Sequence, residues 1–168
     1  MSTKEHKAKA PKNVTLGIIS VSTTRNLAED KSGRWIGKQA RKEKHEVLFH
    51  EVVTDDAAVI TAAVLKAIRT HAPQVLLLSG GTGISRRDVT IEALRPLFSK
   101  ELTAFGVLFA QLSYEEIDSA AILSRATAGV VANTIVFCMP GSLKACKLAC
   151  KQLIFPELGH LVAHIHQE

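Results

Sequence analysis

Short apolar runs alternate along the chain with longer segments in which apolar residues recur every three or four positions. The short runs are rich in β-branched residues and have polar residues on both sides, which is typical of buried strands. The longer segments have the spacing of helices that bury one face. The pattern predicts strands at 14–21, 46–53, 74–78 and 134–138, and helices at 32–44, 57–71, 103–117, from 143 onward and at 157–166.

The order of these elements indicates the fold class. Strands and helices alternate through the first half of the chain, and the last predicted strand again runs into a helix. This alternation is typical of a parallel sheet with helices on both faces. Ser32 is the candidate N-cap of the first helix, and Thr54, Asp55 or Asp56 must cap the second. No repeat or internal linker divides the chain, so we expect one domain.

The middle of the chain has a less regular pattern. Within it, the predicted helix 103–117 carries a wide apolar stripe formed by Phe105, Leu108, Phe109 and Leu112. Such a stripe is expected to lie either against the core or against a second subunit, and the sequence leaves both open.

Charge is distributed unevenly between the N-terminus and the rest of the chain. The 168 residues include 21 Lys and Arg against 16 Asp and Glu, a net charge of +5. Residues 1–12 hold four lysines against one glutamate, so this basic tail, which we expect to be flexible, accounts for +3. The single domain, 13–168, is left with about +2. A nucleic-acid-binding fold usually shows clustered Lys and Arg, so we do not expect nucleic acid as a partner.

Cysteine content and hydropathy restrict the compartment. Three cysteines are too few for a secreted disulfide framework. No stretch approaches the roughly 20 apolar residues of a membrane span, and no apolar run follows the charged N-terminus as in a signal peptide. We therefore expect a soluble, cytoplasmic protein without a membrane partner.

Candidate chemistry gathers in three loops that follow predicted strands, at 54–56, 79–90 and 139–142. In an open parallel sheet, ligands bind at the carboxyl ends of the strands. The three loops are therefore expected to meet at one site.

The most distinctive local motif is the glycine-rich loop Ser79-Gly80-Gly81-Thr82-Gly83. Its glycines permit a tight turn in which several backbone N–H groups point at one anion, and the two hydroxyl groups can add hydrogen bonds. The motif matches neither a P-loop nor the dinucleotide fingerprint. It is expected either to hold a phosphate or to serve only as a strand-to-helix turn.

Arginines and carboxylates accompany this loop. Arg86 and Arg87 are suited to bidentate contacts with a phosphate. Asp88 is expected either to bind Mg²⁺ together with nucleotide phosphates or to cap the helix after it, a role that Thr90 could also take. Only one of Thr54, Asp55 and Asp56 is needed to cap the helix after the second strand, so at least one carboxylate is left over, and Asp55 is a candidate for the same site as Asp88. This set fits a magnesium–nucleotide enzyme better than a hydrolase triad.

Together the loops resemble the MogA/MoaB family of molybdenum cofactor biosynthesis. The resembling motifs occur in the family's order over nearly the whole chain beyond the tail. They are LGIISVS at 16–22, DKSG at 30–33, VTDD at 53–56, SGGTG at 79–83, RDVT at 87–90, E at 101 with FG at 105–106, LS at 112–113, ILSRA at 122–126 and MPGS at 139–142. The segments 105–117 and 140–149 look closer to the MoaB branch of the family.

The resemblance implies an α/β three-layer sandwich with a mostly parallel central sheet, and a homotrimer or dimer of trimers. It implies Mg²⁺-dependent adenylylation of molybdopterin by ATP, which yields adenylyl-molybdopterin and pyrophosphate before insertion of molybdenum or tungsten. The alternative is a non-catalytic molybdopterin-binding or carrier protein of the same fold. Other proteins of molybdenum cofactor biosynthesis are further candidate partners.

The resemblance also assigns residues. Members taken to be active carry two aspartates that map to Asp55 and Asp88, the candidate catalytic and Mg²⁺-binding residues. The nucleotide-binding candidates are Ser79, Gly80, Gly81, Thr82, Gly83 and Arg87. The pterin-binding candidates are Ser113, Ser124, Arg125, Pro140, Gly141 and Ser142. The chain departs from many MogA-like members in its first loop, where Ser22-Thr23-Thr24-Arg25 replaces an Asp-Arg pair.

Overall fold

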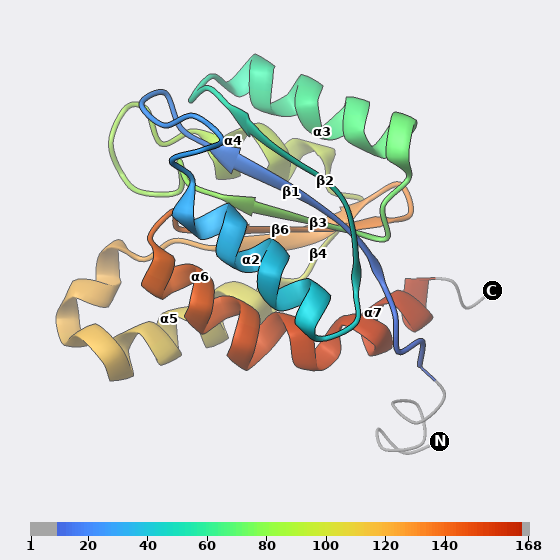
Figure 1. Ribbon diagram of the computed structural model, residues 1–168. Helices are drawn as coiled ribbons and strands as arrows, with labels where there is room; N and C mark the ends of the chain where they lie inside the picture. Colours follow the sequence, from blue (N-terminus) through green and yellow to red (C-terminus); the bar gives the residue numbers. More distant parts are fainter. Residues whose placement is uncertain (1–9, 166–168) are drawn as a thin grey trace.

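A central sheet of six strands organises the protein, whose computed structural model describes residues 10–165 (Figure 1). The strands are β1 (Thr15–Val21), β2 (Glu46–Val53), β3 (Val75–Ser79), β4 (Lys100–Glu101), β5 (Thr127–Val131) and β6 (Thr134–Met139). Their order is β2-β1-β3-β6-β5-β4. The neighbours among β2, β1, β3 and β6 pair in parallel, and β5 runs antiparallel to β6 and β4. The four parallel strands are those that the sequence predicted.

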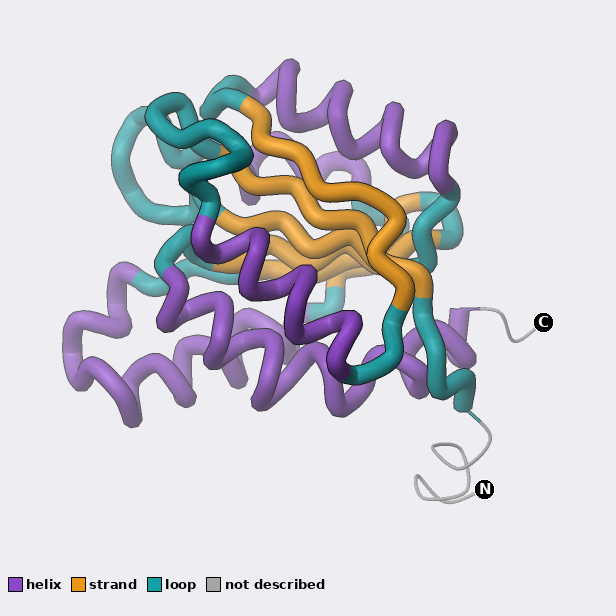
Figure 2. The backbone as a smooth tube through the Cα atoms, viewed as in Figure 1, coloured by secondary structure: helices purple, strands orange, loops and turns teal. Residues whose placement is uncertain are grey.

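Helices cover both faces of the sheet, which confirms the predicted α/β three-layer sandwich (Figure 2). One face carries α3 (Ala57–His71) and α4 (Thr90–Leu94), which a 3₁₀ turn (Arg95–Leu97) follows. The other face carries α2 (Lys31–Lys42), α5 (Thr103–Ile117), α6 (Leu143–Ala149) and α7 (Leu158–Ile165). A 3₁₀ segment (Asp118–Leu123) follows α5, and a π-helical turn (Cys150–Ile154) and a 3₁₀ turn (Phe155–Glu157) join α6 to α7.

Alternate side chains of the strands fill two separate core layers. On β1, Leu16 and Ile18 belong to the layer beneath α2 and α6, whereas Ile19 and Val21 belong to the layer beneath α3. All four are buried. Since both faces of the strand are covered, its sequence is almost continuously apolar, which is why the run was visible without the structure.

The cap of α2 corrects a sequence prediction. The N-cap is Asp30 rather than Ser32, because the Asp30 Oδ1 atom accepts a hydrogen bond from the Gly33 amide at 2.9 Å. Ser32 lies inside the helix, is buried, and donates its hydroxyl to the Gly141 carbonyl at 2.9 Å. The serine thus ties the first turn of α2 to the loop after β6.

The helix α5 has the predicted bounds, but its apolar stripe is divided. Phe105 and Phe109 are buried in the core, whereas Leu108 is 46% exposed. The stripe therefore serves the core along one edge and leaves apolar surface along the other.

The strand order contains a switch point. The chain leaves β1 for its neighbour β2 and then returns past β1 to β3 on the other side. The loops that follow β1 and β3 therefore diverge, and they leave a crevice at the carboxyl ends of these strands.

The ends of the chain lie outside this description. Residues 1–9, which make up most of the predicted basic tail, and residues 166–168, which include the end of the last predicted helix, are not among the described residues. Within 10–165, no helix has the length and apolar character needed to cross a membrane.

Candidate functional site

An open cavity of about 550 Å³ lies at the carboxyl ends of the parallel strands. This volume is typical of small-ligand sites. Its walls come from the segments after β1, β2, β3 and β6, as expected at a switch point. The lining residues are Val21, Ser22, Thr24, Arg25, Lys31, Ser32, Asp55, Gly80, Gly81, Asp88, Gly141, Ser142 and Leu143.

Asp55 reaches the cavity because its neighbour caps the helix. The Asp56 Oδ1 atom accepts from the Val59 amide at 3.0 Å and so begins α3. Asp55 is free of that role, and its Oδ2 atom accepts a hydrogen bond from the Thr23 hydroxyl at 2.8 Å. A residue of the divergent first loop therefore orients this carboxylate.

Asp88 does not cap α4. That helix has Val89 at its N-cap position and no side-chain capping bond. Asp88 instead accepts a hydrogen bond at Oδ2 from the Ser85 amide at 2.9 Å. Hydrogen bonding by the Ser85 side chain, the Ser85 and Gly83 amides and the positive charge of Arg125 together lower the pKa of Asp88, although burial opposes them. The carboxylate is thus held ionised, the form that binds a cation.

The glycine loop adopts a conformation that requires glycine. Gly80 and Gly81 have φ angles of +100° and +64°. A Cβ atom on Gly80 would press on the Val21 carbonyl. Thr90 braces the turn, since its hydroxyl donates to the Gly80 carbonyl at 2.8 Å and its amide to the Gly81 carbonyl at 2.9 Å. Because both carbonyls accept hydrogen bonds from Thr90, the turn is held in place and forms the floor of the cavity.

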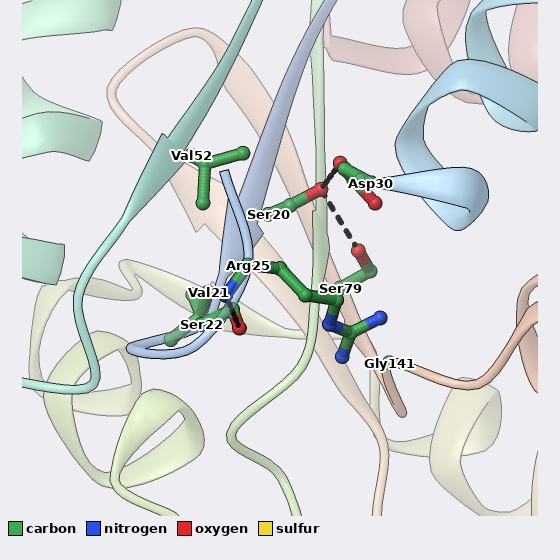
Figure 3. Close-up of a pocket in the computed structure, with 8 residues that line it drawn as sticks. All are labelled: Ser20, Val21, Ser22, Arg25, Asp30, Val52, Ser79 and Gly141. Atoms are coloured by element: carbon green, nitrogen blue, oxygen red, sulfur yellow. Dashed lines mark hydrogen bonds between the residues drawn. The ribbon is translucent and has the colours of Figure 1, made fainter. Parts of the chain in front are cut away.

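A buried polar network lies beneath this floor (Figure 3). Asp30, 3% exposed, accepts hydrogen bonds from Ser20 and from the Gly33 amide, and its Oδ2 atom lies 2.7 Å from His50 Nε2. The Ser20 hydroxyl also lies 3.3 Å from the hydroxyl of Ser79. Burial raises the pKa of Asp30, but the bonds from His50, Ser20 and Gly33 outweigh it and lower the pKa to about 2.

The structure brings some predicted nucleotide-binding residues together and leaves others aside. Gly80 and Gly81 line the cavity. Ser79 is buried in the network below and borders a narrow crevice of about 10 Å³, room for one water molecule. Thr82 is buried, while Gly83 lies against the Asp88 carboxylate. Arg87 is exposed and is not among the lining residues.

The predicted pterin-binding residues divide in the same way. Gly141 and Ser142 line the cavity, whereas the Pro140 carbonyl accepts from the Cys146 thiol at 3.3 Å. Ser113 is buried and donates to the Phe109 carbonyl within α5 at 2.7 Å. Arg125 is ion-paired with Glu92, and neither it nor Ser124 is among the lining residues.

Sequence reasoning did not place the start of α2 in the site. Lys31 and Ser32 line the cavity together with Arg25, which the sequence identified only as part of the divergent first loop. Arg25 extends across the crevice toward Gly141 (Figure 3). The signal was available, because the polar loop 22–30 follows a strand in the same way as the three loops that were chosen.

The donor set suits a cation that keeps other ligands. Among residues 10–165, no three His, Cys, Asp or Glu side chains are grouped to hold a metal ion. Asp55 and Asp88 supply two carboxylates to one cavity. Mg²⁺ is commonly bound by one or two carboxylates, with water and phosphate oxygens completing its shell. The pair therefore fits Mg²⁺ delivered with a nucleotide.

Comparison with known families gives a match over most of the chain. Residues 17–160 match the family described as "Probable molybdopterin binding domain". The chain is also 48% identical over 169 aligned positions to "Molybdenum cofactor biosynthesis protein B" of Bacillus subtilis, covering 100% of this chain and 99% of that protein.

Solved structures show the same similarity in three dimensions. A crystal structure of "Molybdenum cofactor biosynthesis protein B" superposes with a TM-score of 0.91 at 44% identity, covering 95% of this chain and all of that one. The "tungsten cofactor synthesizing protein MoaB" of Pyrococcus furiosus gives 0.85 at 39% identity, with 94% and 100% covered. A MogA structure is 23% identical and shares the fold, with a TM-score of 0.80 and 90% and 99% covered.

Proposed function

This chain belongs to the family of molybdopterin-binding domains that includes MogA and MoaB, and from that membership and the geometry of its cavity we propose that it adenylylates molybdopterin. The protein functions in molybdenum or tungsten cofactor biosynthesis. In the proposed reaction, the terminal phosphate of molybdopterin attacks the α-phosphorus of ATP. The bond to the pyrophosphate leaving group breaks, and adenylyl-molybdopterin and pyrophosphate are released.

The observation that carries the proposal is the meeting of two carboxylates and a glycine turn in one cavity. Asp55, Asp88, Gly80 and Gly81 come from the ends of two different strands and line the same space. Asp55 and Asp88 would hold Mg²⁺, which supplies positive charge beside the phosphates when bound. A site with this composition is suited to a phosphorylated nucleotide.

The reaction does not require a strong general base. A phosphate monoester has a second pKa of about 6, so it is largely ionised at pH 7. The task of the protein is to bring two polyanions together and to neutralise their charge. Arg25 and Lys31 line the cavity and serve this purpose. Gly141 and Ser142, on the side of the cavity after β6, are the candidates for contact with the pterin.

A turnover assay with matched variants tests the proposal. Purified protein is mixed with molybdopterin and Mg-ATP, and adenylylated pterin and pyrophosphate are measured. We expect Asp55→Ala and Asp88→Ala to reduce turnover at least about a hundredfold, since each removes charge from the reacting site. Asp56→Ala is the control, because it removes a neighbouring carboxylate that caps α3. It should cost about 1 kcal/mol of stability and leave turnover within about twofold.

Each other outcome has a defined meaning. Full turnover by the Asp88→Ala variant would disprove the assigned role of that residue. If the wild type binds molybdopterin but forms no pyrophosphate, the protein is a carrier of the same fold. In that case Asp55 and Asp88 would have no catalytic function.

We also propose that the protein is a homo-oligomer, a trimer or a dimer of trimers, that cooperates with other cofactor-biosynthesis proteins. The support for self-association is apolar surface on α5 and on the 3₁₀ segment after it. Val107 is 68% exposed, Tyr114 60% and Ile122 87%. Large apolar side chains grouped on a surface are typical of protein contacts.

A further inference from the structure

Two stripes of positive charge lie on neighbouring helices of one layer. On α2, Lys31, Arg34, Lys38 and Arg41 recur at intervals of three and four residues, which places them along one face of the helix. All four are exposed, and so is Lys42 beside them. The opposite face of α2 is buried against the sheet through Ile36 and Ala40. The stripe therefore points to solvent along the whole helix.

The second stripe runs along α6 and the π-helical turn that continues it. Lys144, Lys147 and Lys151 are spaced by three and four residues and are exposed. The helices α2 and α6 lie side by side (Figures 1 and 2). Trp35 of α2 joins them, since the Nζ atoms of Lys147 and Lys151 each lie 5.8 Å from the centre of its ring. The eight cations thus form one surface, which we call the basic face.

The charge of the basic face is not balanced by paired carboxylates in the described part of the chain. None of its eight cations forms an ion pair with a carboxylate among residues 10–165. Like charges one helical turn apart destabilise a helix. Of the eight cations, Lys31 lines the cavity and the other seven do not. The repulsion between these cations lowers helix stability, and seven of them have no role in the cavity. Both observations indicate that the basic face binds an anionic partner.

The length of the basic face distinguishes a large partner from a small one. Lys31 borders the cavity, and Arg41 lies ten residues further along α2. At 1.5 Å per residue that separation is about 15 Å, whereas charges are screened over about 8 Å at physiological ionic strength. The far cations therefore contribute little to a small anion at the cavity. A macromolecule that lies along both helices would contact them all.

The charge of the remaining chain distinguishes a protein from a nucleic acid. Apart from the basic face and residues 1–12, the chain has nine Lys and Arg against fifteen Asp and Glu, a net charge of −6. A nucleic-acid duplex carries one negative charge per roughly 1.7 Å of its axis, so a duplex longer than the face would extend over a domain that repels it. A short acidic segment of a protein would fit within the basic face and would not extend over the repelling surface.

We propose that the basic face is a docking surface for an acidic helical segment of a partner protein. Carboxylates three and four residues apart on such a helix would match the spacing of the two stripes, and Trp35 would lie beneath the helix between them. Since Lys31 belongs to both the basic face and the cavity wall, the docked partner lies beside the cavity mouth. The proposal holds equally for an adenylyltransferase and for a carrier, because it depends only on the helices.

Fluorescence anisotropy with defined probes tests the proposal. The first probe is a labelled 20-residue helical peptide in which Glu residues are spaced alternately three and four residues apart. The second probe has the same composition in scrambled order. The variant Arg34→Gln/Lys38→Gln/Lys147→Gln removes three charges from the basic face. The control Lys66→Gln/Arg69→Gln/Lys100→Gln removes three charges from exposed positions on α3 and β4. Exposed substitutions of this kind leave the fold intact.

At about 150 mM salt we expect the patterned peptide to bind the wild type about fivefold more tightly than the scrambled peptide. The basic-face variant should bind the patterned peptide about tenfold more weakly, and the control should remain within about twofold. If both variants lost the same affinity for the patterned peptide, binding would depend on net charge alone, and the proposal would be overturned. A 20-base-pair DNA that binds more tightly than the peptide and loses affinity in the basic-face variant would also overturn it, as would no difference between the peptides.

Discussion

Asp30 links several elements that surround the site. It caps α2, accepts from Ser20 on β1, and lies 2.7 Å from His50 on β2, while Ser20 in turn reaches Ser79 on β3. A buried carboxylate is costly unless it is hydrogen-bonded, and here each bond comes from a different segment. The residue therefore holds three strands and a helix together directly below the cavity floor.

The depressed pKa of Asp30 predicts how stability depends on pH. A folded-state pKa of about 2, against an ordinary value of 3.8, means that the ionised form stabilises the fold. The difference corresponds to about 2 kcal/mol, which is fully present above pH 4 and is lost as the pH falls toward 2. Asp30→Asn should remove this contribution at pH 7 and flatten the dependence between pH 4 and 2, as measured by urea unfolding.

A matched substitution separates this effect from the general loss of a carboxylate. Glu116→Gln lies on an exposed turn of α5 and should change the free energy of unfolding by less than about 0.5 kcal/mol. An Asp30→Asn variant with the same pH profile as the wild type would show that the network does not store this energy.

At the scale of elements, the site is built where strands end and helices begin. Asp56 caps α3 and so frees Asp55, and Thr90 begins α4 while bracing the Gly80–Gly81 turn. Ser142 caps α6 by accepting from the Ala145 amide at 3.2 Å, and it also lines the cavity. Each of these residues lies at the end of a loop that contributes to the cavity wall, and Ser142 both caps its helix and lines the cavity.

Two glycines with different roles predict contrasting results. Gly80→Ala should destabilise the protein by more than about 2 kcal/mol and weaken Mg-ATP binding, because its φ of +100° is strained for alanine and the new methyl group would press on the Val21 carbonyl. Gly37→Ala within α2 should stay within about 1 kcal/mol of the wild type. There the new methyl group lies 3.3 Å from Arg41 and 3.4 Å from Ile18, and alanine favours the helix.

Thermal unfolding and calorimetric titration of Mg-ATP would measure both variants. If Gly80→Ala unfolds like the wild type and binds nucleotide normally, the left-handed turn is not required for the proposed phosphate site.

At the scale of the whole molecule, apolar and basic surfaces occupy different parts of the same layer. The basic face lies on α2 and α6, whereas the exposed apolar residues lie on α5 and the segment after it. Assembly through the apolar surface would leave the basic face available to an acidic partner. The two proposed contacts are therefore compatible in one oligomer.

Light scattering coupled to size-exclusion chromatography tests the proposed self-association. The wild type should elute as a multiple of its 18.2 kDa chain, and Val107→Asp/Ile122→Asp should shift it to the monomer, because charges would then be buried in the contact. Leu65→Asp on α3 is the control, since Leu65 is 42% exposed but lies on the other face. A monomeric wild type at micromolar concentration would contradict the proposal.

The sequence was sufficient to predict the sandwich, the four parallel strands and the loops that meet at the site. These features depend on local patterns, namely buried β-branched runs, apolar residues at helical spacing, and glycine or capping residues where strands end. The same patterns made Asp55, Asp88, Gly80 and Gly81 candidates and the family resemblance assigned their roles; all four line the cavity. The antiparallel pair β4 and β5 escaped prediction because one strand has two residues and the other lies in the irregular middle of the chain.

Only the tertiary structure decided which residues meet across long distances in the chain. It placed Lys31 and Arg25 in the cavity wall, and it buried Ser79 and Ser113 away from the mouth. It showed that Asp30, not Ser32, caps α2 and that this aspartate lies beside a histidine twenty residues away. It also gathered eight cations from two separate segments into one face, although the whole domain has a charge of only about +2. The physical reason is that such contacts depend on how helices and strands pack, and local spacing in the chain does not encode them.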